Sequence, residues 1–212
     1  MSREAEILEQ QLEARDPDVR LMVQVRADLS GAFESLVARY QNRLVGVLFH
    51  LVGSIEEAED LCQEVFLRIY KARKGYRARA KFATWLFTIA NNLALNHLRS
   101  KGRNPSVPMS GAATDSQASG PVVAGQLEGR EGTPSAQMRK AELADVVREA
   151  LAVLNDDQKM AVLLNKFEGM SYAEIAQVMG RSPAAVKSLL ARARNQLREQ
   201  LEPYLLTGQR GR

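Results

Sequence analysis

Residues 170–199, MSYAEIAQVMGRSPAAVKSLLARARNQLRE, decide how the C-terminal half of the chain folds, because two helical patterns meet in them at a glycine. Ser171 and Glu174 have the spacing of a capping box and predict the start of a short helix, YAEIAQVM. Ser182 predicts the cap of a second helix, with Pro183 at its first position, where a missing N–H costs nothing. Two helices joined by a tight glycine turn are typical of the helix-turn-helix, whose second helix enters the DNA major groove.

Apolar and basic residues separate on the second helix. Its apolar residues recur every three or four positions and are expected to face the core: Val186, Leu190, Ala193 and Leu197. Five Lys/Arg and no acid occur from residue 181 to residue 198, and these side chains donate to guanine or to phosphate. The predicted groove contacts are Ser182, Ala184, Lys187, Ser188, Ala191 and Arg192, and the predicted phosphate contacts are Arg181, Arg194 and Arg198. A helical hairpin that binds only protein, with a solvated basic face, is the alternative.

Charge is sorted along the chain. The formal net charge is +4, but residues 1–64 hold 13 acids against 6 Lys/Arg, whereas residues 65–114 hold ten Lys/Arg and no acid. This asymmetry favours a polyanion as partner. The acid-free block also carries aromatic residues: Phe66, Tyr70, Tyr76, Phe82, Trp85 and Phe87. Cations follow a phosphate backbone and aromatic faces stack on unpaired bases, so the block is typical of a surface for single-stranded nucleic acid.

Part of this aromatic set has a competing explanation as core. Phe66 and Tyr70 lie four residues apart on one predicted helix, which favours packing inside the domain. Trp85 is likewise favoured as core, with strand contact left open. Tyr76 and Phe82 lie in a glycine-containing, arginine-rich loop, where both roles stay open.

Helical periodicity dominates the chain and no segment alternates with period two, so the predicted fold class is all-α. In the N-terminal half, a first helix is expected to end at Gly53, with an apolar face that includes Leu36, Leu44 and Leu48. Further helices are expected at about 54–72 and 84–98, with a short extra helix in DVRLMVQVR. Ser30 or Asp28 is the predicted cap of the first, and Ser54 with Glu57 is the predicted capping box of the second. In the C-terminal half, helices are expected at 136–153, with Leu143, Val146, Val147 and Leu151 inward, and from a capping box at Asn155 and Gln158 to about Phe167.

A segment rich in Gly, Ser, Ala and Pro separates the two halves and holds too little apolar content to fold, which predicts a flexible linker. The architecture expected is therefore two small helical domains joined by a flexible linker, the C-terminal one a helix-turn-helix. The predicted boundaries are an N-terminal extension at 1–17, a first domain at 18–103, the linker at 104–136, a second domain at 137–202 and a tail at 203–212.

Two segments resemble a known family. SYAEIAQVMGRSPAAVKSLLARARNQLRE resembles the C-terminal promoter-binding region of bacterial sigma factors. DLCQEVFLRIYKARKGY followed by FATWLFTIANNLALNHLRSKGR resembles their conserved second region. Only these two regions appear, joined by a linker, which is the arrangement of the extracytoplasmic-function (ECF) group of the sigma-70 family. The resemblance covers roughly 18–103 and 137–201 and implies a factor that binds core RNA polymerase, directs it to promoters and helps to open the DNA. It also implies an anti-sigma protein as a partner.

The resemblance assigns surfaces as well. It implies that the helix after Ser54 binds polymerase through Asp60, Leu61, Gln63, Glu64, Phe66, Leu67 and Lys71. It implies that the loop at 74–81 and the helix after it read the melted −10 element through Tyr76, Arg77, Arg79, Lys81, Phe82, Trp85, Asn91, Asn92, Asn96 and Arg99. The helix that begins after Ser182 would read the double-stranded −35 element. The acids near the start of the polymerase-binding helix fit a basic partner, although Glu56 and Glu57 are equally explained by the helix dipole.

An enzyme is not expected, and neither are cofactors or metal. His50 and His97 are the only histidines, and both lie in helical patterns, where a structural role, or a phosphate contact for His97, is expected. Cys62, the only cysteine, occupies an apolar helical position and is expected to pack in the core; it fits a reducing setting. No glycine-rich phosphate loop and no paired-cysteine motif occurs.

A cytoplasmic protein is expected, because no run of about 18 apolar residues occurs and the N-terminus lacks the apolar centre of a signal peptide. Two rival functions stay open. A helix-turn-helix regulator that acts without polymerase would usually dimerise on paired half-sites and would have no need of the acid-free aromatic block. An adaptor that binds only protein would leave both basic faces unexplained.

Overall fold

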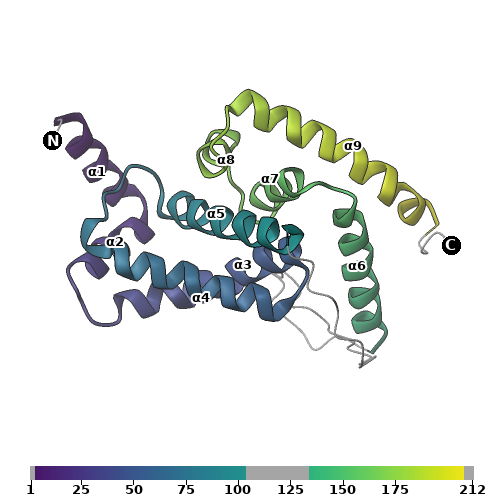
Figure 1. Cartoon of the computed structure of the whole chain (residues 1–212), viewed down its shortest axis with the longest axis horizontal. Coiled ribbons are helices and arrows are strands. Elements are labelled where there is room, and N and C mark those ends of the chain that lie inside the picture. The colour runs from purple at the N-terminus through teal and green to yellow at the C-terminus, as the bar shows by residue number, and fades with distance from the viewer. Residues whose placement is uncertain (1–2, 104–133, 208–212) are drawn as a thin grey trace.

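The computed structural model describes residues 3–103 and 134–207, and every regular element in these ranges is a helix, as the sequence predicted (Figure 1). The first domain contains α1 (Arg3–Arg15), α2 (Pro17–Arg26), α3 (Ala32–Val52), α4 (Ile55–Ala72), the single turn η1 (Arg73–Gly75) and α5 (Phe82–Arg103). The second contains α6 (Pro134–Ala152), α7 (Asp156–Lys166), α8 (Tyr172–Met179) and α9 (Pro183–Thr207). Nearly all of the predicted linker, residues 104–133, lies outside the described residues, as does the end of the predicted tail.

The core of the first domain forms where α3, α4 and α5 pack together, with α2 against α3. The predicted apolar face of α3 is confirmed, since Leu36, Leu44 and Leu48 are fully buried. The predicted cap of this helix is wrong: Gly31, in the left-handed region at φ 80°, precedes α3 without a side-chain cap. Asp28 instead forms ion pairs with Arg73 and Lys74.

Only half of the capping box predicted for α4 forms. The Ser54 hydroxyl accepts a hydrogen bond from the Glu57 N–H at 3.3 Å. The Glu57 carboxylate does not return to the backbone of Ser54, because it accepts from His97 Nε2 at 3.0 Å and from Lys101 Nζ at 2.7 Å on α5. A residue expected to begin a helix therefore also joins α4 to α5.

The second domain has the helix-turn-helix that the sequence predicted. Full capping boxes begin α7 and α8, at Asn155 with Gln158 and at Ser171 with Glu174. Gly180 ends α8 in the left-handed region at φ 62°, and the Ser182 hydroxyl caps α9 by accepting from the Ala185 N–H at 3.2 Å. On α6, Val146 and Leu151 are buried as expected, but Leu143 is 50% exposed and does not face the core.

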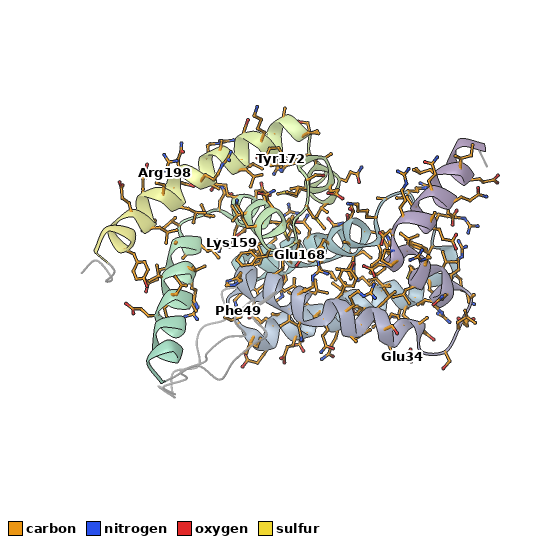
Figure 2. All side chains as sticks on the ribbon, turned by 180° about the vertical axis from the view of Figure 1, so that it is seen from behind. Glu34, Phe49, Lys159, Glu168, Tyr172 and Arg198 are labelled. Carbon is orange, nitrogen blue, oxygen red and sulfur yellow. The ribbon has the colours of Figure 1, made fainter. Side chains whose placement is uncertain are left out.

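The two domains contact each other through α5 with α8 and through α3 with α7 (Figure 1). Lys81, just before α5, pairs with Glu174 of α8 at 2.8 Å. Arg43 of α3 pairs with Glu168, the residue after Phe167, where the second domain meets the first (Figure 2). The first helix of the helix-turn-helix, α8, thus rests on α5.

Candidate nucleic-acid and polymerase interfaces

The surface of α9 separates apolar from polar side chains as the sequence predicted. Val186, Leu190 and Ala193 are buried, and Leu197 packs partly against the core. Every predicted contact residue here is exposed: Arg181, Ser182, Ala184, Lys187, Ser188, Ala191, Arg192, Arg194 and Arg198. Figure 2 shows α9, which carries Arg198, along the outer edge of the molecule. An exposed basic helix with small residues among its cations can approach base edges closely. Contact with DNA stays a prediction.

The basic loop, residues 76–81, alternates between buried and exposed side chains. Tyr76 and Ala78 point into the domain and are 4% and 2% exposed, whereas Arg77, Arg79 and Lys81 are exposed. The loop therefore presents cations on one side and anchors itself with the other. Such a row of cations can follow a phosphate backbone.

Three of the predicted strand-contact side chains are almost fully buried. Phe82 and Asn91 lie inside the domain, 0% and 3% exposed, and Tyr76 is 4% exposed although it still lines the cavity beside this loop. The rings of Tyr76 and Phe82 instead pack against Trp85, with centroids 4.8 Å and 6.0 Å away. Trp85 itself is half-buried. On α5 the other predicted readers are exposed: Asn92, Asn96 and Arg99.

A cavity of about 780 Å³ lies beside the basic loop. Its lining combines cations, polar groups and two aromatic side chains from the first domain: Lys71, Tyr76, Arg77, Arg79, Thr84, Trp85 and Thr88. Gln177 of α8 contributes from the second domain, and no local pattern of residues predicts its place here. The chemistry of the lining fits a nucleotide, and α8 covers one side of the space.

A second cavity of about 720 Å³, which we call the α3–α4 groove, opens between these two helices. Its lining is largely apolar: Phe33, Val37, Val45, Cys62, Phe66, Leu67 and Tyr70. Of the predicted polymerase-binding residues, Gln63, Phe66 and Leu67 line this groove. Asp60, Gln63, Leu67 and Lys71 are exposed and Glu64 is half-buried, whereas Leu61 and Phe66 are 9% and 7% exposed. Phe66 still reaches the groove, whereas the near-complete burial of Leu61 favours packing.

The groove contains two aromatic residues that the predicted binding set omitted. Phe33 and Tyr70 face each other with ring centroids 5.0 Å apart, and Tyr70 remains 42% exposed. Its spacing from Phe66 indicated core, but one turn of helix brings Tyr70 to the rim. Only the packing of α3 against α4 decides this, and a helical period in one segment does not specify it.

Burial is the largest cause of the pKa shifts of Cys62, His50 and Glu168. It raises the pKa of the Cys62 thiol to about 12, with a smaller effect of Glu59, so the thiol stays protonated and packs as predicted. Burial lowers the pKa of His50, which stacks on Phe167 with ring centroids 6.1 Å apart. Burial raises the pKa of Glu168, and the adjacent Arg43 guanidinium opposes that shift.

Two further observations concern the described residues only. Within them, no group of three or more His, Cys, Asp or Glu side chains is placed to hold a metal ion. None of the described helices combines the length and the apolar character that a bilayer crossing requires.

Comparison with known proteins gives relatives along most of the chain. The RNA polymerase sigma-H factor of Pseudomonas aeruginosa is 33% identical over 199 residues, which are 90% of this chain and 97% of that protein. The ECF RNA polymerase sigma-E factor of Haemophilus influenzae is 33% identical over 188 residues, with 89% and 97% covered.

Solved structures agree with this. The complex of CnrH with the cytosolic domain of CnrY matches with a TM-score of 0.62 and 23% identity over 89% of this chain and 99% of that chain, which shows the fold. The sigma factor RpoE of Bartonella quintana, bound to the anti-sigma factor NepR, matches with a TM-score of 0.59 and 25% identity over 80% and 96%. Sigma-70 region 2 matches residues 36–104 and Sigma-70, region 4 matches residues 144–197. The chain therefore belongs to the sigma-70 family of RNA polymerase sigma factors, in its extracytoplasmic-function group.

Proposed function

We propose that the two domains divide promoter recognition between double-stranded and unpaired DNA. The second domain holds the −35 duplex with the exposed face of α9. The first domain binds core polymerase with α4 and the α3–α4 groove and holds the melted non-template strand with the basic loop and α5. The chain supplies recognition as an initiation factor, and the polymerase carries the chemistry.

The observation that carries this proposal is the distribution of exposed cations. Lys187 and Arg192 lie on one helix of the second domain, and Arg77 and Arg79 lie beside a nucleotide-sized cavity in the first. A regulator that bound only paired half-sites would need the first surface and not the second. Both surfaces, together with an apolar groove on the remaining face of the first domain, fit a protein held between polymerase and two forms of DNA.

The proposed binding to polymerase also indicates where the protein acts and what could regulate it. The protein acts in the bacterial cytoplasm, where the polymerase is. An anti-sigma protein is a proposed partner, since two of the matched structures are complexes and one of them names an anti-sigma factor. The α3–α4 groove could bind apolar side chains of such a partner.

In-vitro transcription tests the proposal. Purified chain is combined with core RNA polymerase, and the holoenzyme selects its promoter from a library of random-sequence DNA. The expected result is a run-off transcript with one start site on the selected DNA, which core polymerase alone does not produce. DNA binding by the chain alone on paired half-sites, with no start-site choice, would instead establish the regulator.

A further inference from the structure

The N-terminal helix α1 lies before the matched region 2, which begins at residue 36, and the proposed function gives it no task. It nevertheless connects to the basic loop. Arg26 Nη1, at the end of α2, donates to Glu9 Oε1 of α1 at 2.8 Å and to the Tyr76 carbonyl oxygen at 3.0 Å. The side chains of Glu9 and Arg26 are only 19% and 27% exposed, so solvent screens this ion pair incompletely. One guanidinium thus ties the first residue of the loop to α1.

The other end of the loop is tied to the residue between α1 and α2. Asp16 Oδ2 accepts from the Phe82 N–H at 3.1 Å, and its Oδ1 accepts from the Asp18 N–H at 2.9 Å. Phe82 is the first residue of α5, where backbone N–H groups have no partner within the helix. Asp16 therefore caps two helices, its own neighbour α2 and the distant α5.

The segment between these two ties carries the cations that the proposed function assigns to the unpaired strand. Arg77, Arg79 and Lys81 repel one another and would spread over many conformations in a free loop. Fixing both ends limits these conformations. The acids lie on the inner side of the loop: besides burial, the charges of Asp16 and Glu9 raise the pKa of the Tyr76 hydroxyl, which reports their proximity.

We propose that α1 and Asp16 form a brace that holds the basic loop in the shape that receives the unpaired −10 strand, which makes Glu9, Asp16 and Arg26 positioning residues for promoter opening. This inference rests on the proposed function. It gives the N-terminal extension a task at one promoter element and none at the other, because α9 lies in the other domain.

The test uses holoenzyme assembled from core polymerase and the full chain. The probe is a single-stranded non-template oligonucleotide with the −10 sequence of the promoter that the wild-type holoenzyme selects. Glu9→Ala and Asp16→Ala each remove one tie and are expected to weaken strand binding about five- to tenfold, the worth of roughly one hydrogen bond. Affinity for core polymerase and for a duplex that carries only the −35 element should stay within about twofold of wild type, which a general loss of folding would not allow.

Two controls separate positioning from bulk stability. Asp16→Asn keeps one oxygen that can accept from the Phe82 N–H but turns its NH2 toward the Asp18 N–H, so its strand binding is expected to fall less than that of Asp16→Ala. Glu6→Ala removes the same charge as Glu9→Ala from an exposed site on α1 and should change nothing. If Asp16→Ala unfolds at the assay temperature, the strand affinity of Glu9→Ala alone tests the brace.

Wild-type strand affinity in Glu9→Ala, or equal losses on strand and duplex, would overturn the brace. A wild-type holoenzyme that selects no promoter would overturn the proposed function, and the brace with it.

Discussion

Lys187 is exposed on α9 and has small neighbours on the same face, Ala184, Ser188 and Ala191. Because these side chains are short, the helix backbone can come close to the floor of the major groove while the longer lysine reaches a base or a phosphate. Arg181 is placed differently, since it pairs with Asp157 of α7. At this scale we predict that the second domain separates residues that specify the sequence from residues that only position the helix.

Lys187→Ala should weaken holoenzyme binding to the −35 duplex by about 1–3 kcal/mol if the side chain contacts a base, with relaxed specificity at one position. Competition binding against duplexes with single base changes measures both effects. A phosphate contact would instead lower affinity on all sequences and flatten the salt dependence. Lys166→Ala, which removes an equal charge from an exposed site on α7, should leave binding unchanged. Wild-type affinity in Lys187→Ala would contradict the groove-facing assignment.

Single residues also show where sequence reasoning stops. Exposure on α9 followed from its helical period, because one face of an amphipathic helix must be buried. No such period exists in the basic loop, where aromatic residues serve equally well as core or as stacking surface. The structure uses Tyr76 and Phe82 to anchor the loop and leaves the arginines outside.

Among the elements, the turn between α8 and α9 depends on one backbone conformation. Gly180 has φ 62°, and a Cβ added there would meet nothing within 4 Å. A side chain at this position would therefore lower stability through the left-handed backbone conformation and not through a clash with neighbouring atoms. The turn sets the angle between the two helices of the helix-turn-helix.

Gly180→Ala should lower the free energy of unfolding by about 1–2 kcal/mol. Chemical denaturation followed by circular dichroism measures the change. Gly75→Ala is the matched control, since a Cβ there also meets nothing within 4 Å and its φ is not positive, so its stability should stay within about 0.5 kcal/mol of wild type. An equal effect of the two substitutions would show that the left-handed conformation is not the cause.

Glu57 joins α4 to α5 through charge. Hydrogen bonds from Lys101 and, less strongly, from His97 lower the pKa of its carboxyl from the usual 4.5. A lowered pKa in the folded state contributes stability that is present above pH 4.5 and is lost as the pH falls through the folded-state pKa. Glu57→Gln should therefore be less stable than wild type near neutral pH, by up to about 1 kcal/mol because the site is partly exposed.

Unfolding free energies of wild type and Glu57→Gln across the pH range test this. Their difference should vanish as the pH falls well below 4.5. A difference that persists unchanged in acid would mean that the carboxylate charge is not what joins the helices.

Over the whole molecule, the contact between the domains conflicts with simultaneous reading of both promoter elements. The −35 and −10 elements are separated by about 25 base pairs, or roughly 85 Å at about 3.4 Å per base pair. Here α8 rests on α5 and covers one side of the cavity beside the basic loop. We therefore expect the domains to separate on a promoter, and the stretch from 104 to 133 is long enough to allow it, since about 30 residues span at most roughly 100 Å.

Glu168→Ala should shift the free chain toward separated domains. The carboxylate is nearly buried, with 1% of its side chain exposed, and it pairs with Arg43 across the domain contact. Losing this carboxylate should reduce the free energy that favours the closed arrangement of the domains by about 1–3 kcal/mol. Small-angle scattering should then give a larger radius of gyration than for wild type or for Glu199→Ala, an exposed charge removal on α9. An unchanged radius would mean that this pair does not hold the domains together.

Sequence reasoning predicted the all-helical fold and the helix-turn-helix, because caps, glycine turns and helical periods act within a few residues. It did not predict the contacts that join distant segments. Arg43 and Glu168 are 125 positions apart and Asp16 and Phe82 are 66 apart, and no local pattern specifies such pairs. They are the contacts that close the domains and hold the basic loop.

The division of labour between the domains is tested most directly by measuring holoenzyme affinity for two probes, a duplex with only the −35 element and a single strand with only the −10 element. The account predicts opposite losses of affinity. Lys187→Ala weakens binding to the duplex and leaves binding to the strand unchanged. The double variant Arg77→Ala with Arg79→Ala weakens binding to the strand and leaves binding to the duplex unchanged. Variants that weaken both probes equally, or neither, would contradict it.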